Sequence, residues 1–173
     1  MRCVLALFAA SFVFASAANL SAAESKVTIE KTHLCCNACV KGAEKAVTSV
    51  AGAAAKCDRD AGTVTITASD AATAQKAVDA LATAGYYGKA TGAEIKDDSG
   101  AKAGNVKAAT VSGFHNCCKK CTTAINETIA KVPGAKGEVD AKATTVKVSG
   151  DFDAKKLVET FNEAGFHVKV SAK

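Results

Sequence analysis

Two stretches of this sequence share one spacing of histidine and cysteine: HLCCNAC at residues 33–39 and HNCCKKC at residues 115–121. The two histidines are 82 positions apart (115 − 33 = 82), and each cysteine of the first stretch has a counterpart at the same offset. A single offset for four rare residues indicates an internal duplication. The fold should therefore contain one unit present twice.

The residues around the first stretch predict a mixed order of strands and helices. Apolar residues alternate with polar ones before His33, which indicates a half-buried strand. After the cysteines the apolar residues recur at three- and four-residue steps, which indicates a helix. The expected elements are a strand around Val27, a helix over 37–50, a hairpin of strands over 53–57 and 64–66, a helix from the N-cap Asp70 to Gly85, and a last strand over 86–90.

The second copy repeats this order, with a strand over 106–112, a helix over 119–132, strands around Val139 and over 146–148, and a second helix through Leu157 to Gly165. Each copy therefore has the βαββαβ order of a ferredoxin-like sandwich, in which two helices cover one face of a four-stranded antiparallel sheet. We expect an α+β fold with tandem domains at 26–90 and 105–171. The Gly, Ala, Lys and Asp content of 91–104 predicts a flexible linker.

The first 23 residues have the pattern of a secretory signal peptide. Arg2 supplies the positive charge, an apolar run follows, and small residues come next, so cleavage is expected after Ala23, with Ala17 as the alternative. The apolar run is shorter than the roughly 20 residues of a membrane span. Export predicts a periplasmic or secreted protein. Removal of Cys3 leaves an odd number of cysteines (8 − 1 = 7), so at least one thiol stays free or binds something.

Composition narrows the range of partners. After loss of Arg2 the chain has 21 basic residues (22 − 1) against 17 acidic ones, scattered along the sequence. The chain has no Trp, and its aromatic residues are not interleaved with Arg, so the sequence lacks the pattern expected of a nucleic-acid-binding protein. No other stretch is apolar enough to span a membrane.

The cysteine spacing favours soft metal ions. Cys36 and Cys39, like Cys118 and Cys121, fall at the start of a predicted helix, where free N–H groups favour a thiolate. Only the deprotonated thiol binds metal, and sulfur ligands select Cu(I), Zn(II) or Hg(II). Neither stretch contains Asp or Glu, which argues against Ca(II) and Mg(II).

The element order, with C-x-x-C between the first strand and the first helix, resembles the heavy-metal-associated domain family. That family includes copper chaperones and the periplasmic mercury-binding protein, so the resemblance implies a non-catalytic metal-binding protein. Its usual motif is G-M-T-C-x-x-C, followed later by an aromatic or basic residue near the metal loop. By this resemblance the metal-binding cysteines are Cys36 and Cys39, and Cys118 and Cys121, and the aromatic residues are Tyr86 and Phe166.

Three positions in each copy depart from the family motif. The departing residues are His33, Leu34 and Cys35, and His115, Asn116 and Cys117. Each loop thus has a candidate third sulfur and a candidate imidazole, which would complete a tetrahedral Zn(II) site, whereas Cu(I) needs two or three sulfurs. The alternative is that Cys35 and Cys117 point away, because adjacent residues of an extended segment face opposite sides. The histidines would then orient ligands or lie at the surface.

The leading interpretation is an exported protein that binds soft metal ions for trafficking, buffering or detoxification. Copper is favoured over zinc and mercury, the extra ligands favour retention, and a metal-donor or acceptor protein is the expected partner. The linker would let the two loops meet and share an ion.

The alternative is a thiol–disulfide oxidoreductase that uses the C-x-x-C pairs, although the larger thioredoxin pattern and its proline are missing. Two further interpretations are that the cysteine pairs form local disulfides and that the chain is a purely structural or interaction module.

Two further residues are expected outside the site. Cys57 corresponds to Val139 and should act as a small core residue, and His167 should face solvent from a strand.

Overall fold

The computed structural model describes residues 23–172. The expected signal segment, apart from Ala23, lies outside the described residues, so export stays a prediction. Among the described residues, no helix combines the length and the apolar character that crossing a membrane requires.

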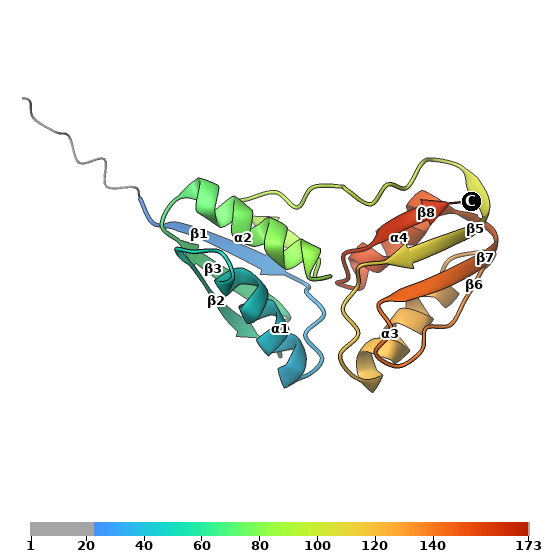
Figure 1. Cartoon of the computed structure of the whole chain (residues 1–173), viewed down its shortest axis with the longest axis horizontal. Coiled ribbons are helices and arrows are strands. Elements are labelled where there is room, and N and C mark those ends of the chain that lie inside the picture. Colours follow the sequence, from blue (N-terminus) through green and yellow to red (C-terminus); the bar gives the residue numbers. More distant parts are fainter. Residues whose placement is uncertain (1–22, 173) are drawn as a thin grey trace, which may run out of the picture.

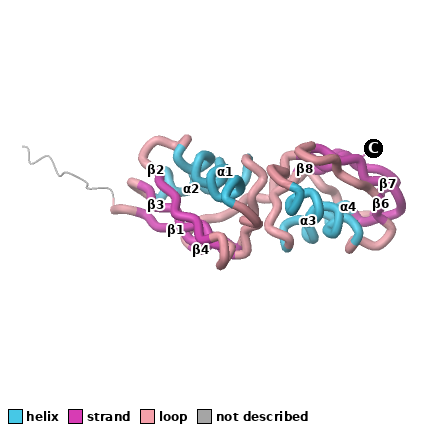
Figure 2. Tube along the Cα trace, turned by 90° about the horizontal axis from the view of Figure 1, so that it is seen from below, coloured by secondary structure: helices cyan, strands magenta, loops and turns pink. Residues whose placement is uncertain are grey.

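Residues 25–91 form the first unit, called unit 1. Its antiparallel sheet has the strand order β2-β3-β1-β4, and both helices lie on one side of it (Figures 1 and 2). The elements are β1 (Ser25–Glu30), α1 (Asn37–Thr48), β2 (Ala53–Asp58), β3 (Thr63–Ala68), α2 (Ala71–Thr83) and β4 (Lys89–Thr91).

Residues 105–172 form unit 2, which has the same topology. Its sheet order is β6-β7-β5-β8, so both sheets have the order expected of a ferredoxin-like sandwich. The elements are β5 (Asn105–Ser112), α3 (Lys119–Ala130), β6 (Ala135–Lys136), β7 (Thr145–Asp153), α4 (Ala154–Glu163) and β8 (Lys169–Ala172).

Two expected strands differ from the sequence-based prediction. The strand expected around Val139 is absent from the described part of unit 2, because the Val139 N–H donates to Asn126 Oδ1 (2.8 Å) and β6 ends at Lys136. The strand expected over 86–90 starts later, at Lys89. Tyr86 instead forms an isolated bridge with Phe166 of the other unit. Both changes occur where backbone groups bond outside their own sheet.

Each unit has its own hydrophobic core, and the two cores differ in residue size. The core of unit 2 contains four buried phenylalanines, whereas Tyr86 is the aromatic side chain in the described core of unit 1, which is otherwise aliphatic with several alanines. Cys121 of unit 2 belongs to the unit 1 cluster. The cores therefore approach each other at the cysteine loops.

Reciprocal backbone contacts dock the two units. Tyr87 N–H donates to the Gly165 carbonyl (3.1 Å), and His167 N–H donates to the Gly85 carbonyl (3.2 Å). These contacts relate equivalent positions of the two copies, so the units face each other about an approximate two-fold axis. In Figure 1 the loops before α1 and α3 run side by side between the units.

The segment between the units is bonded to unit 1. Gln75 Nε2 donates to the Glu94 carbonyl (2.7 Å), and the Glu94 N–H donates back to Gln75 Oε1 (3.1 Å). Lys96 forms an ion pair with Asp79 (3.3 Å). Both partners, Gln75 and Asp79, lie on α2, so this part of the linker follows the helix.

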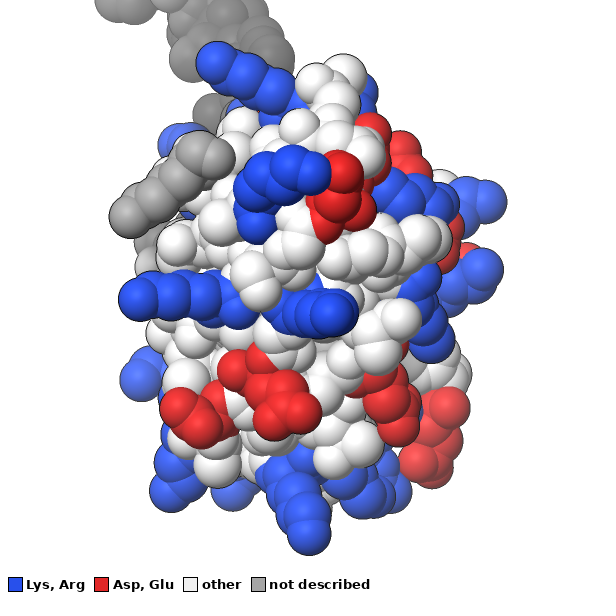
Figure 3. All heavy atoms as spheres, turned by 90° about the vertical axis from the view of Figure 1, so that its right-hand side faces the viewer, with Lys and Arg blue, Asp and Glu red and all other residues white. Residues whose placement is uncertain are grey.

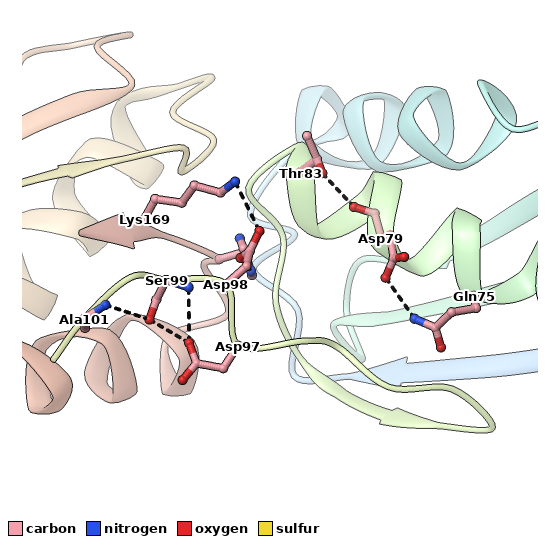
Figure 4. A network of polar contacts seen from close by, with 9 residues as sticks. Gln75, Asp79, Thr83, Asp97, Asp98, Ser99, Ala101 and Lys169 are labelled. Carbon is pink, nitrogen blue, oxygen red and sulfur yellow. Dashed lines mark hydrogen bonds and ion pairs between the residues drawn. The ribbon is translucent and has the colours of Figure 1, made fainter. Parts of the chain in front are cut away.

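The same segment is bonded to unit 2, as Figure 4 shows for part of the network. The Val170 N–H donates to the Ser99 carbonyl (2.7 Å), and Asp98 pairs with His167 (3.0 Å) and Lys169 (3.1 Å). The expectation of a flexible linker is therefore wrong. His167 is buried, not solvent-facing as predicted, because the linker covers it.

Candidate metal centre

Each cysteine loop connects the first strand of its unit to the first helix. Cys36 is the N-cap of α1, with φ −158° and ψ 170°, and Cys118 is the N-cap of α3, with φ −156° and ψ 169°. Cys39 and Cys121 lie in the first turn of these helices. The repeated sequence therefore produces nearly the same backbone in both copies.

Sulfur atoms within each loop lie close together. In the first loop Cys39 Sγ lies 3.6 Å from Cys35 Sγ and 3.7 Å from Cys36 Sγ. In the second loop the equivalent distances from Cys121 are 3.7 Å to Cys117 and 3.8 Å to Cys118.

The two loops bring their sulfurs together across the unit boundary. The shortest contact joins Cys39 and Cys117 (3.1 Å), and Cys39 also lies 3.6 Å from Cys121. Cys35 lies 3.4 Å from Cys118 and 3.5 Å from Cys121, and Cys36 lies 3.8 Å from Cys117. We call this group the thiol cluster. Its members are Cys35, Cys36, Cys39, Cys117, Cys118 and Cys121.

Cys35 and Cys36 both face the thiol cluster, although they are adjacent in sequence. The rule that neighbouring side chains alternate holds in a strand, but β1 ends at Glu30 and the loop bends before α1 begins. The candidate third sulfur is thus brought to the centre in both loops. Cys57 lies on β2 and packs partly buried against the core of unit 1, as expected.

The comparison with protein families agrees with this geometry. Residues 116–167 match the heavy-metal-associated domain. The matched part lies in unit 2 and contains Cys118 and Cys121. No curated protein matches the chain. The heavy-metal-associated domain and the cysteine cluster together indicate that the chain binds heavy-metal ions.

The N-terminus of α1 places Cys36 where its thiolate is stabilised. Partial burial raises the pKa of this thiol, but the nearby backbone N–H groups of Cys39 and Ala38 and the Cys39 thiol stabilise the thiolate and outweigh it, so the pKa falls to about 7. This is the effect expected at a helix N-terminus. Cys36 is therefore ionised in a large fraction of molecules near neutral pH.

The other thiols of the cluster share their protons. Burial raises the pKa of Cys35 and raises that of Cys117 to about 12. The pKa of Cys121 is lowered, chiefly because the Cys39 thiol donates a hydrogen bond to it. A thiolate at the buried centre, surrounded by protonated thiols, is a site where a soft cation can replace the protons.

The two histidines lie beside the cluster but make different contacts. His115 Nδ1 lies 2.8 Å from the Gly85 carbonyl oxygen, and its Nε2 lies 3.1 Å from that of His33. Both nitrogens thus face backbone acceptors, which leaves His115 as a bridge between the units. His33 Nε2 is buried and has no hydrogen-bond partner within the described structure, and it lies close to Cys35 and Cys121. Both imidazoles thus lie beside cluster sulfurs, since His115 is close to Cys39 and Cys121, and they differ in that His33 Nε2 lacks a hydrogen-bond partner among the described residues.

The predicted aromatic residues lie against these histidines, each across the unit boundary. Tyr86 of unit 1 stacks on His115, with ring centroids 4.0 Å apart, and Phe166 of unit 2 stacks on His33 at 4.4 Å. The Tyr86 hydroxyl also donates to the Cys39 carbonyl (2.9 Å). The aromatic pair therefore positions both the rings and one cysteine loop.

Asn116 has a role that the sequence did not indicate. Its Nδ2 donates to the carbonyls of Asp140 and Ala143 (3.0 and 2.9 Å), and its Oδ1 accepts from Thr122 (2.9 Å). The equivalent Leu34 is buried in the core of unit 1. The two cysteine loops are thus held by polar contacts in unit 2 and by apolar packing in unit 1.

Two glycines allow the loops to approach. Gly85 and Gly165 have φ of +88° and +84°. A Cβ at Gly85 would lie 2.3 Å from His115 N, and one at Gly165 would lie 2.4 Å from His33 N. In the sequence these glycines indicate only helix ends, because their contacts come from the distant copy.

Proposed function

We propose that this chain is an exported, non-catalytic protein that captures soft metal ions, Cu(I) before Zn(II) or Hg(II), for trafficking, buffering or detoxification. The observation that carries the proposal is the close approach of sulfurs from the two loops, with Cys39 and Cys117 at 3.1 Å and Cys39 and Cys121 at 3.6 Å. Thiolates select soft ions, and the ligand groups found around the cluster contain only Cys and His.

The distribution of ligands favours Cu(I). A site built for Zn(II) uses four ligands in tetrahedral geometry, whereas Cu(I) accepts two or three sulfurs. The cluster supplies a large excess of sulfur over nitrogen, because six cysteines meet only two imidazoles there, those of His33 and His115. Additional sulfurs also favour retention over rapid transfer, because an ion must leave several ligands before it is released.

The surface supports an ion or a protein as partner. Lys, Arg, Asp and Glu side chains are interspersed on the outer face of unit 2 shown in Figure 3, so that face has no continuous basic surface for nucleic acid. Cys117 is exposed at the cluster, and Lys119 and Lys120 beside it are exposed as well. We place the approach of a donor or acceptor protein with an acidic surface at this edge.

The test is a Cu(I) competition titration of anaerobically purified protein against a chromophoric chelator. Cys36→Ser/Cys118→Ser should lower the affinity at least tenfold, because even the loss of a group that only orients a metal ligand typically costs about 10–100-fold. Cys57→Ser, which changes a cysteine outside the cluster, should titrate like the wild type.

Absence of copper binding in the wild type would overturn the proposal. Catalytic reduction of insulin disulfides by metal-free protein would instead favour the oxidoreductase alternative. N-terminal sequencing of protein recovered from the periplasm or medium tests export, which predicts a chain that begins at Glu24.

A further inference from the structure

The thiol cluster has more sulfurs than a single ion can use. A tetrahedral ion takes four ligands and Cu(I) takes fewer. The six cluster sulfurs nevertheless lie in one connected group, and those of the first loop are not separated from those of the second. Two independent one-ion loops would not require the sulfurs of Cys39 and Cys121 to meet.

The sulfur contacts follow the approximate two-fold axis. Cys35 approaches Cys121 at 3.5 Å as Cys117 approaches Cys39 at 3.1 Å. Cys35 approaches Cys118 at 3.4 Å as Cys117 approaches Cys36 at 3.8 Å. The contact between Cys39 and Cys121 lies on the axis itself. The six sulfurs thus enclose a common centre to which both loops contribute equally.

The spacing of the sulfurs suits shared metal ions. Two sulfurs bound at about 2.3 Å to one three-coordinate ion lie about 4.0 Å apart. The sulfur distances of the cluster run from 3.1 Å to 3.8 Å, so the longest fall only about 0.2 Å short of this separation. Binding of ions between the sulfurs therefore needs every contact to open, by a few tenths of an ångström at most of them.

We infer that the thiol cluster is one polynuclear Cu(I)–thiolate centre shared by both units. This inference rests on the proposed function. If each of the six thiolates bridges two ions and each ion takes three sulfurs, the centre holds about four Cu(I) ions. Loading releases the thiol protons, since only thiolates bridge. The docked units form the site, and neither loop alone contains it.

The interface glycines allow this to be tested without removing a cysteine. In Gly85→Ala/Gly165→Ala the new methyl groups would meet the backbone of the opposite loop at 2.3 and 2.4 Å, so the loops must separate. Gly104→Ala is the matched control, because Gly104 also has a positive φ (+109°) but a Cβ there meets no atom within 4 Å. Both variants place Ala at a positive φ and are strained there, but only Gly85→Ala/Gly165→Ala should lose docking.

The experiment is native mass spectrometry of the full chain during anaerobic titration with Cu(I). The wild type and Gly104→Ala should pass from the metal-free form to a species with about four ions with few intermediates, and X-ray absorption should show copper–copper scattering. The interface variant should bind about two ions in separate steps, one in each C-x-x-C pair, without that scattering.

A wild type that saturates at one or two ions without copper–copper scattering would overturn the inference while leaving the proposed function intact. The same holds if the interface variant loads like the wild type. No bound copper at all would instead overturn the proposed function. Should the interface variant fail to fold, Cys35→Ser/Cys117→Ser provides the second test, because it leaves both C-x-x-C pairs and should halve the bound copper.

Discussion

At the scale of single residues, the two copies differ in the small residue of the first helix and in the aromatic residue that follows the second helix. In unit 1 Gly42 lies against Tyr86, whose hydroxyl occupies the space that a Cβ would need, at 2.4 Å. In unit 2 the equivalent positions hold Ala124 and Phe166. Phe166 has no hydroxyl, so a methyl group is accommodated. The pairs Gly–Tyr and Ala–Phe are therefore matched.

This match predicts strong coupling in a double-mutant cycle. Gly42→Ala should destabilise unit 1 by about 1–3 kcal/mol through overpacking, despite the better helix propensity of Ala. Tyr86→Phe should cost about 1 kcal/mol, because it removes the hydrogen bond to the Cys39 carbonyl. The double variant, which reproduces the arrangement of unit 2, should be more stable than Gly42→Ala alone. Urea unfolding measures all four proteins, and additive effects would contradict the pairing.

The two histidines should have separable effects. His33→Phe keeps the stacking on Phe166 but removes the buried free nitrogen, so it should lower Cu(I) affinity about tenfold with little change in metal-free stability. His115→Phe removes the imidazole contacts with the Gly85 and His33 carbonyls and should lower the free energy of unfolding by about 1–3 kcal/mol.

Chelator competition and urea unfolding of both histidine variants check this assignment. Unchanged affinity in His33→Phe would exclude His33 as a ligand. Unchanged stability in His115→Phe would show that its carbonyl contacts contribute nothing to docking.

The cysteine positions could be predicted from sequence, but the difference between His33 and His115 could not. Residue type and helix position are local properties, and they sufficed to place Cys36 and Cys118 at N-caps. The contacts of His115 are with Gly85 and His33 of the other unit, which no local pattern reveals. The repeated sequence predicts the same role for His33 and His115. Their contacts differ because the two-fold relation between the units is only approximate.

At the scale of elements, the helices divide by the way they begin. Helices α2 and α4 have Asp70 and Asp153 as N-caps, and these accept from the N–H groups of Thr73 and Lys156. Helices α1 and α3 begin at cysteines that make no side-chain cap hydrogen bond. The metal-loop helices therefore keep their first N–H groups available for a thiolate, at the expense of a stronger cap.

The acidic caps predict a pH dependence of stability. Hydrogen bonds from the Thr73 N–H, the Thr73 hydroxyl and the Ser69 hydroxyl lower the pKa of Asp70 from 3.8 to about 2. Because the pKa is lower in the folded state, this contribution is present in full above the unfolded pKa and is lost as the pH falls through about 2.

Asp70→Asn, which keeps an acceptor but cannot ionise, should therefore melt below the wild type at pH 5 and together with it near pH 2. Thermal unfolding of metal-free protein followed by circular dichroism measures the difference. Asp153→Asn should behave alike, since the Lys156 N–H lowers the pKa of Asp153 as well. A difference that persists unchanged to pH 2 would contradict the assignment.

Element order was predictable because each strand and helix has its own apolar period, and the fold follows from that order. The elements that differ are those whose partners are remote in sequence. Tyr86 lies outside β4 and forms a bridge with Phe166, and Val139 lies outside β6 and donates to Asn126. The linker resembles a flexible segment in sequence because its bonds to Gln75 and Lys169 are made with residues that no local pattern connects to it.

At the scale of the whole molecule, the cores of the two units should give them unequal stability. Phe114, Phe152, Phe161 and Phe166 fill the core of unit 2, whereas unit 1 relies on Val, Ile and Ala with Tyr86. Burial of large side chains contributes more hydrophobic free energy, at about 25 cal/mol per Å² of apolar surface. Unit 1 should therefore unfold first when no metal holds the units together.

Metal binding should turn two unfolding events into one. Both tyrosines of the chain are in unit 1, at its boundary with unit 2, and there is no tryptophan, so tyrosine fluorescence reports the unfolding of unit 1 and its separation from unit 2, while circular dichroism reports both units. Without metal, fluorescence should change at a lower urea concentration than the second part of the circular dichroism transition. With Cu(I) about 100-fold above its Kd the two signals should coincide, because the ions bind where the sulfurs of both units meet, and stability should rise by more than the roughly 2.7 kcal/mol that a single bound ion provides. Separate transitions in the loaded protein would mean that the ions do not link the units, and earlier unfolding of unit 2 would mean that core size does not decide the order.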